Sequence, residues 1–484
     1  MKMNKKCFVA VLCILFVFGS VWAEDEAFDE FGSFGDSFER SDSFFGSFDE
    51  GVASASALSW SGRVDSFVRL YTDTGSSAES TPVASDPTLT LGLTYAGDKT
   101  DFDAKIKLSH EVIIDYPMDV LEELTLRSYL GEFVVEAGKM KVVWGKGDKL
   151  HVLDNFNATD FTDFLIPDYI DRRIALPMVR VVYNGLEQMS FEAVYTPFMT
   201  ADRFATEGLW VPGSYTTLKE SVTTIALANA QALFSSDNYA LVVAYLASIT
   251  PEGLQPNTNT VEYGQYGVRF TGTVNTFDWG ASYYLGCNKQ PSADLSKVTY
   301  PSVVPSQLPT LAYDRLQVFG LEGATVFGPL NFRGEFAYNL TDDIDGDDPW
   351  VSNNSVGWVF GFDVGFPVGN LSFNVQNIGS YTLKNDKIST VYDVDYNAEG
   401  TWSNNKIVFA LSDSFLHEKL STECNLIWGV ENGDLMVMPK ITYSVTEGLD
   451  ASLSGMYIYA SENSSEFYDF RNNSFVQAKV AYSF

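Results

Sequence analysis

Few side chains in this sequence could act as a general acid, a general base or a nucleophile. Hydrolysis by such groups needs a histidine beside a nucleophile or a pair of acids, and the chain has three histidines, His110, His151 and His417. His151 is the one with acids close to it, Asp148 and Asp154. A loop histidine beside acids is more often a solvated polar residue. We therefore expect no enzymatic activity and no catalytic residue.

Metal and redox chemistry have no motif either. The four cysteines lack metal-binding or redox spacing, and Cys287 and Cys424 fall in segments too far apart in the chain order to predict a disulfide. Residues 341–349 carry five aspartates around Gly346, but their positions do not complete a Ca²⁺-loop motif, which favours a hydrated loop. We expect no metal site and no cofactor.

Basic residues form a repeated pattern in the first part of the chain. In residues 102–111, Lys105 and Lys107 alternate with Ala104 and Ile106, and successive side chains of a strand point to opposite faces. The same alternation predicts a set of basic residues that line the inside of a pore: Arg63, Arg69, Lys105, Lys107, Arg127, Lys139, Lys141 and Arg180.

Two interpretations of this basic set stay open. In a narrow lumen of low dielectric constant, the basic residues would attract anions. Alternatively, they pair with acids on the same faces, such as Asp65, Asp103 and Glu192, and only stiffen the wall.

The segment 145–176 is too apolar for a simple solvated loop. Val152, Leu153, Phe156 and Phe161 need burial, and the nearest cover is the interior of the structure that the strands form. Folded inward, the segment would set its acids beside the basic wall and constrict the pore in a transverse electric field. The residues predicted for this constriction are Trp144, Asp148, Asp154, Asn157, Asp160, Asp163, Arg172 and Arg173. An external cap packed on neighbouring loops is the alternative.

The elements that position these residues are alternating segments of about ten residues, a length typical of strands that cross a membrane. The sequence contains about 20 of them, with 16 or 18 as alternatives, and they include 222–234 and 239–249. In lipid every backbone N–H and C=O must be paired within the protein, so such a sheet has to close into an antiparallel barrel. A Lys or Arg facing lipid would cost about 2–4 kcal/mol, which is why we place the basic residues inside. A soluble β-sandwich or propeller is the alternative fold.

The connections and the chain end support a barrel in an outer membrane. Short and long connections alternate along the sequence, as periplasmic turns and external loops do, which predicts that both termini are periplasmic. The last strand presents Val480, Tyr482 and Phe484 on one face. We interpret these three residues as a membrane-insertion signal for the barrel-assembly machinery.

Three parts are predicted along the chain. Residues 1–23 form a secretory signal peptide, with three lysines, a short apolar run and a small-residue end. Residues 24–56 are acidic and rich in Phe, Gly and Ser, which predicts disorder; this periplasmic segment is either a solvated tether or a docking tail for a periplasmic partner. Residues 57–484 form the barrel, and no later segment is apolar and long enough for a helical span.

Net charge excludes one class of partner. At −32, the chain would repel the phosphates of nucleic acid. The expected partners are outer-membrane lipid, the assembly machinery and small solutes.

The stretch from Glu136 to Met178 resembles a family of poorly characterised outer-membrane barrels related to porins. It contains Gly138-Lys139, Val143-Trp144-Gly145, Asp154-Asn155-Phe156-Asn157 through Asp160, Arg172-Arg173 and Leu176-Pro177-Met178. Members show a strand ending in Trp-Gly and then an Asn-Pro-x-Asp turn, in which Ala158 replaces the proline here. The general style also resembles outer-membrane proteins of spirochaetes. The resemblance implies a membrane barrel with uptake or porin-like function and no defined substrate.

Three functions are compatible with these patterns. The first is a porin-like channel for diffusion or uptake of small solutes, with a preference for anions and with 145–176 as its constriction. The second is an adhesin or structural barrel whose external loops bind ligands. The third is transport of hydrophobic compounds through a lateral opening.

Overall fold

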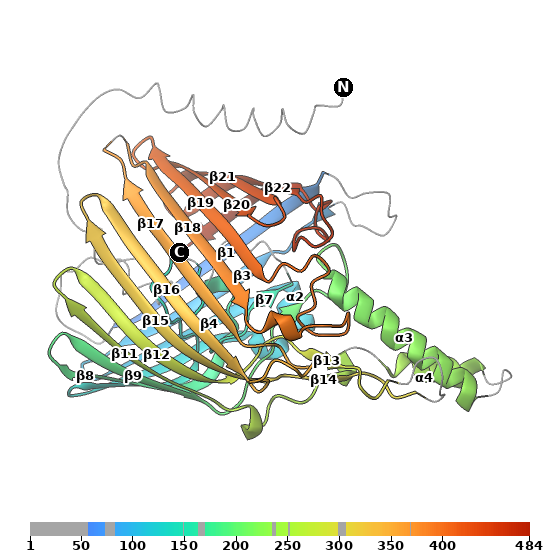
Figure 1. Cartoon of the computed structure of the whole chain (residues 1–484). Helices are drawn as coiled ribbons and strands as arrows, with labels where there is room; N and C mark the ends of the chain where they lie inside the picture. The colour runs from blue at the N-terminus through green and yellow to red at the C-terminus, as the bar shows by residue number, and fades with distance from the viewer. Residues whose placement is uncertain are drawn as a thin grey trace. The chain divides into compact units, whose positions relative to one another are not determined.

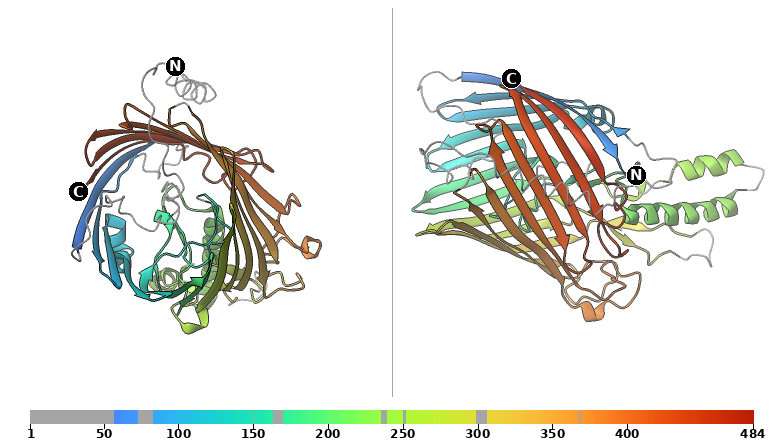
Figure 2. Two further views of the ribbon diagram at one scale, coloured as in Figure 1. Left: turned by 90° about the vertical axis from the view of Figure 1, so that its left-hand side faces the viewer. Right: turned by 90° about the horizontal axis from the view of Figure 1, so that it is seen from above.

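Alternating residues produce the strands of one closed barrel, seen from three sides in Figures 1 and 2. The computed structural model describes residues 57–72, 83–148, 150–162, 170–234, 239–249, 252–298, 306–367 and 369–484. The barrel belongs to the compact unit Ser56–Phe484. The predicted signal peptide and the segment 24–56 lie outside the described residues.

The barrel has 18 strands, where the sequence predicted about 20 with 18 as an alternative. Nineteen strands share the sheet, and one of them, β2 (Val83–Ala84), is a two-residue addition to β1. Each of the other strands pairs with its neighbour in an antiparallel ladder, and β23 pairs with β1 from Arg63↔Ser483 to Tyr71↔Phe475. This last ladder closes the ring, so the prediction of a closed antiparallel barrel is confirmed.

The first nine strands of the ring are β1 (Ala57–Tyr71), β3 (Thr88–Ala96), β4 (Thr100–Leu108), β5 (Leu121–Leu130), β6 (Phe133–Met140), β8 (Leu176–Leu186), β9 (Met189–Thr196), β11 (Gln265–Val274) and β12 (Phe277–Cys287). The other nine are β15 (Arg315–Phe327), β16 (Leu330–Thr341), β17 (Ser355–Gly365), β18 (Ser372–Thr382), β19 (Ser403–Phe415), β20 (Leu420–Gly429), β21 (Leu435–Thr446), β22 (Leu449–Tyr459) and β23 (Phe475–Ser483).

Two predicted strands are helices, and they account for the difference in strand number. The segments 222–234 and 239–249 fall in α3 (Gly213–Leu233) and α4 (Tyr239–Ala247), a hairpin that projects from one end of the barrel (Figure 1). The buried residues of α3 are Val222, Ile225, Ala226, Asn229 and Ala230. Their spacing follows a period of 3.6 residues rather than 2, and the segment is rich in alanine, the strongest helix former. The strand prediction counted apolar residues and missed this period.

The two faces of the wall differ in polarity. On β1, Trp60, Val64 and Val68 are 70%, 46% and 50% exposed, whereas Arg69 on the opposite face is 5% exposed. The same alternation gives the ring an apolar exterior and a largely polar interior. Val480, Tyr482 and Phe484 lie on the exterior at the closing seam, with exposures of 53%, 48% and 63%.

Connection lengths alternate around the ring as predicted. At one end the strands are joined by the short turns 97–99, 131–132, 187–188, 275–276, 328–329, 366–371, 416–419 and 447–448. The opposite end carries the longer connections, of which 430–434 is the short exception. Both the start of β1 and the end of β23 lie at the short-turn end.

The long connections contain the remaining elements. These are α2 (His110–Ile114), β7 (Asp160–Phe161), β10 (Arg203–Phe204), β13 (Ser292–Asp294), β14 (Thr310–Ala312) and the single-turn helices η2 (Pro117–Asp119), η3 (Ile170–Arg172), η4 (Glu252–Leu254), η5 (Val261–Tyr263) and η6 (Asn385–Lys387). Among the described helices, none combines the length and apolar character needed to cross a bilayer.

Candidate functional site: the lumen and its mouth

The described residues of the connection 141–175 enter the barrel. Its apolar residues Trp144, Leu153 and Phe156 are 1–2% exposed and pack with inward residues of the wall, including Tyr284 on β12 and Val318 on β15. The ring of Trp144 meets Phe156 edge-on with centroids 5.0 Å apart. Burial of these side chains is what the apolar content of this segment required.

We call the connection 141–175 the inward segment. Its main anchor is Glu335 of β16. Its side chain is fully buried. One carboxylate oxygen accepts the N–H of Gly147 at 2.6 Å and lies 2.8 Å from His151 Nδ1, while the other accepts the N–H of Val152 at 2.8 Å. Gly145 passes so close that a Cβ would lie 2.1 Å from the carboxylate, and its φ of +119° also favours glycine. The Trp-Gly pair therefore marks the point where the chain turns into the lumen.

Asp148 ties the same segment to β18. Its N–H donates to Gln376 Oε1 at 3.2 Å, and its carboxylate accepts from Asn374 Nδ2 at 2.9 Å. Seven barrel strands separate β6 from β18 on one side of the ring and nine on the other. The segment thus crosses nearly the full width of the lumen, and the end-on view in Figure 2 shows coil inside the ring.

Two further residues hold the base of the segment. Asn157, 1% exposed, accepts the N–H of Val142 at 2.8 Å and donates to the carbonyls of Met140 and Ile174. Asp154 forms a 2.6 Å ion pair with Arg173. Asp160 pairs with Arg203 rather than with the predicted basic wall. Arg172 lies in η3, and Asp163 is outside the described residues.

Most of the predicted basic residues have acidic partners. Arg127 pairs with Glu136 at 2.6 Å, and Arg180 bridges Glu136 and Glu192, both at 2.8 Å. The chain of alternating charges continues from Glu192 through Arg269 of β11 to Glu322 of β15. We call this set, Arg127, Glu136, Arg180, Glu192, Arg269 and Glu322, the charge ladder. Because neighbouring charges in it have opposite signs, the ladder is nearly self-neutralised.

Glu322 reaches Arg269 across the intervening strand β12. The position on β12 beside it is Gly280, where a Cβ would lie 2.5 Å from the Glu322 carboxylate. Trp144 also joins the ladder, since its indole N–H donates to Glu192 at 2.9 Å. The inward segment and the charged wall are therefore one connected structure.

The other predicted basic residues lie outside the ladder. Arg63 lies 3.6 Å from Asp65, and Arg69 donates to Gln477 at 2.9 Å. Lys105 and Lys141 share Glu122, at 3.3 and 3.0 Å; Lys107 is half-buried on the same inner face as Lys105. Lys139 pairs in register with Leu124, an outward position, and its ammonium reaches Asp119 in the connection 109–120 at 3.0 Å.

Residues 197–212, which we call the strap, were not singled out by the sequence. The strap leaves β9, runs across the long-loop end and reaches the rim at β1 and β23. Arg203 holds its middle, with ion pairs of 2.6 Å to Asp119 and 2.9 Å to Asp160 and with Tyr116 stacked 3.4 Å away. Trp210 holds its far end, donating to the Tyr71 hydroxyl at 2.8 Å.

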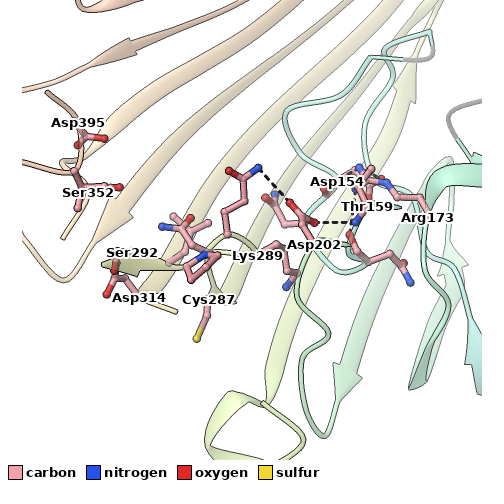
Figure 3. A pocket seen from close by; sticks show the side chains of 17 residues that line it. Asp154, Thr159, Arg173, Asp202, Cys287, Lys289, Ser292, Asp314, Ser352 and Asp395 are labelled. Carbon is pink, nitrogen blue, oxygen red and sulfur yellow. Dashed lines mark hydrogen bonds and ion pairs between the residues drawn. The ribbon is translucent and has the colours of Figure 1, made fainter. Parts of the chain in front are cut away.

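A cavity of about 500 Å³ lies at this end of the lumen, between the inward segment, the strap and other long connections (Figure 3). Its polar lining includes Asp154, Asp202, Lys289, Asp314 and Asp395. Asp202 accepts the N–H of Thr159 at 2.8 Å, which joins strap to segment. Burial raises the pKa of the Asp202 carboxyl and lowers the pKa of Lys289 to about 7.

Residues 131–484 match the family described as "Protein of unknown function (DUF1302)". The chain belongs to this family. The match includes the inward segment, the Trp-Gly stretch and the charge ladder apart from Arg127 of this DUF1302 protein, and it extends to the last residue. Comparison with curated proteins found no match.

Solved structures similar to this DUF1302 protein align with most of its chain at low sequence identity, and one of them is titled a porin. A BenF-like porin from Pseudomonas fluorescens Pf-5 aligns at 10% identity over 88% of this chain and 98% of that chain, with a TM-score of 0.46. OccAB4 from Acinetobacter baumannii aligns at 9% identity over 88% and 97%, with a TM-score of 0.44. OccK3 (OpdO) from Pseudomonas aeruginosa aligns at 9% identity over 88% and 95%, with a TM-score of 0.46.

Proposed function

We propose that the protein is a bacterial outer-membrane channel for diffusion or uptake of small hydrophilic solutes, constricted by the segment 145–176. The observation that carries this proposal is the combination of an apolar exterior, a polar interior and a segment bound inside the ring by Glu335. An adhesin needs no such internal segment, whereas a channel uses one to set its aperture.

The exterior supports the membrane location. Outward side chains such as Val64, Leu321 and Phe360, exposed at 46%, 59% and 55%, would be costly in water over so large a surface. Hydrocarbon solvates them, and the closed ladder leaves no backbone edge unpaired in lipid. Barrels of this kind have short turns on the periplasmic side, so both termini are periplasmic in this proposal.

The predicted basic residues support an anion preference less strongly than the sequence suggested. Arg127 and Arg180 have acidic partners within 2.8 Å, so their fields are largely cancelled. We propose that anion preference comes from basic residues outside the charge ladder, chiefly Lys107 and the partly exposed Arg63.

Single-channel recording in planar bilayers tests the channel. The mature protein should insert and conduct, and a salt gradient should give a reversal potential of the sign expected for anions. Lys107→Gln should move that potential toward zero, while Arg180→Gln, within the neutralised ladder, should move it less. A folded barrel that inserts but never conducts would refute the channel.

One observation favours the alternative of ligand-binding external loops. The hairpin of α3 and α4 projects beyond the strands and exposes apolar residues, with Leu233 at 55% and Leu241 at 50%. Binding of a ligand to the intact barrel that is lost when residues 213–247 are deleted, without any conductance before or after, would support that alternative.

A further inference from the structure

The ladder between β21 and β22 is interrupted inside the wall. Pairing runs from Leu435↔Tyr459 to Val437↔Tyr457 and resumes at Lys440↔Ser454. The gap covers Met438 and Pro439, whereas pairing of these two residues with β20 is continuous. Proline has no N–H to donate and is normally confined to edges, strand starts and bulges. Here it stands in the interior of a strand with no free edge.

The outer surface at this gap carries only the ring of Pro439, because the opposite residue, Gly455, has no side chain. The register places Gly455 of β22 opposite Pro439. A Cβ at Gly455 would meet atoms no nearer than 3.4 Å, and its φ is not in the positive region. Neither crowding nor backbone geometry therefore requires glycine here. The outward neighbours Ile441 and Leu453 are large and 43% and 54% exposed, so the bare site is local.

The inner surface at the same gap is apolar. Inward residues of β21 to β23, Met436, Met456, Ile458 and Phe475, are 1–6% exposed and form one cluster with Trp210, Phe467 and Phe470, and Met438 packs against it. We call this cluster the methionine patch. Further along the same two strands, toward the short turns, the inner face returns to Lys440 and Ser454. The patch therefore extends from the level of the gap toward the long-loop end only.

We propose that this seam between β21 and β22 is a lateral route by which apolar molecules pass between the lumen and the bilayer, with the methionine patch as their binding face inside. Missing cross-strand pairing lowers the resistance to parting the strands at this one place, and the bare outer surface leaves a path to lipid. Methionine side chains are flexible and adapt to apolar ligands of different shape. Trp210 of the strap covers the patch from the side of the mouth. This route is separate from the axial path of the proposed channel.

A reversible lock across the seam tests the route. The register is the same on both sides of the gap and places Met438 opposite Met456, both facing inward, and a disulfide joins residues whose Cα atoms are about 4.4–6.8 Å apart. The double variant M438C/M456C, in a C287S/C424S background, would join β21 to β22. The matched control is N425C/M438C, which joins β21 to β20 across the intact ladder and shares the Met438 substitution.

Entry of the apolar fluorescent probe N-phenyl-1-naphthylamine is measured in cells whose lipopolysaccharide outer membrane excludes it. We expect several-fold slower entry when the M438C/M456C lock of the seam is oxidised, and recovery when it is reduced. The oxidised control should not change entry. Pro439→Val, which restores the missing N–H, should also slow entry without any disulfide. Equal entry through the locked and unlocked seam, or equal slowing by both locks, would overturn the route.

Conductance of the same variants in planar bilayers separates this proposal from the channel. The oxidised seam lock should conduct as the reduced form does. Absence of conductance in every variant would refute the channel alone, whereas the probe measurement decides the lateral route.

Discussion

The inward segment and the strap both lie at the long-loop end of this barrel, and they are held in different ways. The inward segment has its main anchor in one buried carboxylate, Glu335, which accepts two backbone N–H groups and contacts His151. The strap is fixed at two separate points: the adjacent Asp202 and Arg203 near its middle and Trp210 at its far end. A segment whose contacts centre on one deep anchor moves as a unit, whereas one held at separate, shallower points can open in part. We infer that the inward segment sets the aperture and that the strap is the more mobile of the two.

Loss of the main anchor, Glu335, should have the largest effect. Glu335→Ala leaves two buried N–H groups without an acceptor, at about 1–3 kcal/mol each, so the inward segment should detach from β16. Single-channel conductance should rise severalfold, and chemical denaturation should show a loss of about 2–6 kcal/mol in stability.

Glu322→Ala is the control for this change. Glu322 lies directly opposite Glu335 in the ladder between β15 and β16 and binds Arg269 instead of the inward segment. It should lower stability but leave conductance unchanged. Equal conductance in the Glu335 variant and the wild type would contradict the anchor.

Removal of one strap anchor should have a smaller effect. Arg203→Met deletes two charge-assisted hydrogen bonds that are partly exposed, so we expect about 1–3 kcal/mol of local destabilisation. Hydrogen exchange of residues 197–212 should accelerate while that of the inward segment stays slow. Lys406→Met is the control, because its partner Glu466 is 51% exposed and such a pair contributes about 0–1 kcal/mol. Faster exchange in both connections would show that they are not independent.

The ion pair between Arg203 of the strap and Asp119 also predicts that the stability of the strap depends on pH. Burial alone would raise the pKa of the Asp119 carboxyl, but Arg203 and Lys139 outweigh it and lower that pKa. A carboxyl whose pKa is lowered by folding contributes stability above its unfolded value, about 3.9, and loses it as the pH falls through the lowered value. Strap exchange should therefore stay slow from neutral pH to about pH 4 and accelerate only below it. Acceleration near neutral pH would contradict this assignment.

The smallest effect concerns the cavity between the two connections. Burial lowers the pKa of Lys289 to about 7, and the nearby Asp202 offsets this only in part. As the pH falls through that value, Lys289 gains a proton and the mouth gains a positive charge. The cation-to-anion permeability ratio should fall between about pH 8 and pH 6 in the wild type and stay flat in Lys289→Gln. The same slope in both proteins would exclude Lys289 as its cause.

Local patterns in the sequence predicted much of the wall. The eighteen barrel strands, the closing strand and the burial of Leu153 and Phe156 follow from alternation, turn spacing and apolar content. The strand predictions for 222–234 and 239–249 were wrong because short apolar runs are compatible with both the strand period of 2 and the helix period of 3.6. In 222–234 only the spacing of the buried residues distinguishes the two: Val222, Ile225, Ala226 and Ala230.

Pairing between distant strands could not be predicted in the same way. The inner face of residues 330–340 already contains Glu335 by alternation, but its contact with Gly147 joins residues 188 apart. The partners of Arg127 and Arg180 depend on the register between strands. The sequence therefore left open whether these arginines pair with acids. The strap has no apolar period of its own, and its anchors lie on other connections.

The position of the inward segment is most directly tested by a disulfide between Val152 and Gly357 of β17. A Cβ built on Gly357 would lie 3.6 Å from the Val152 Cβ, within the spacing of disulfide-bonded cysteines, about 3.5–4.5 Å. V152C/G357C in the C287S/C424S background should therefore oxidise spontaneously in the folded barrel, and thiol labelling should show both cysteines blocked until reduction. Two freely labelled cysteines in the folded protein would show that the segment does not lie against the wall inside the lumen.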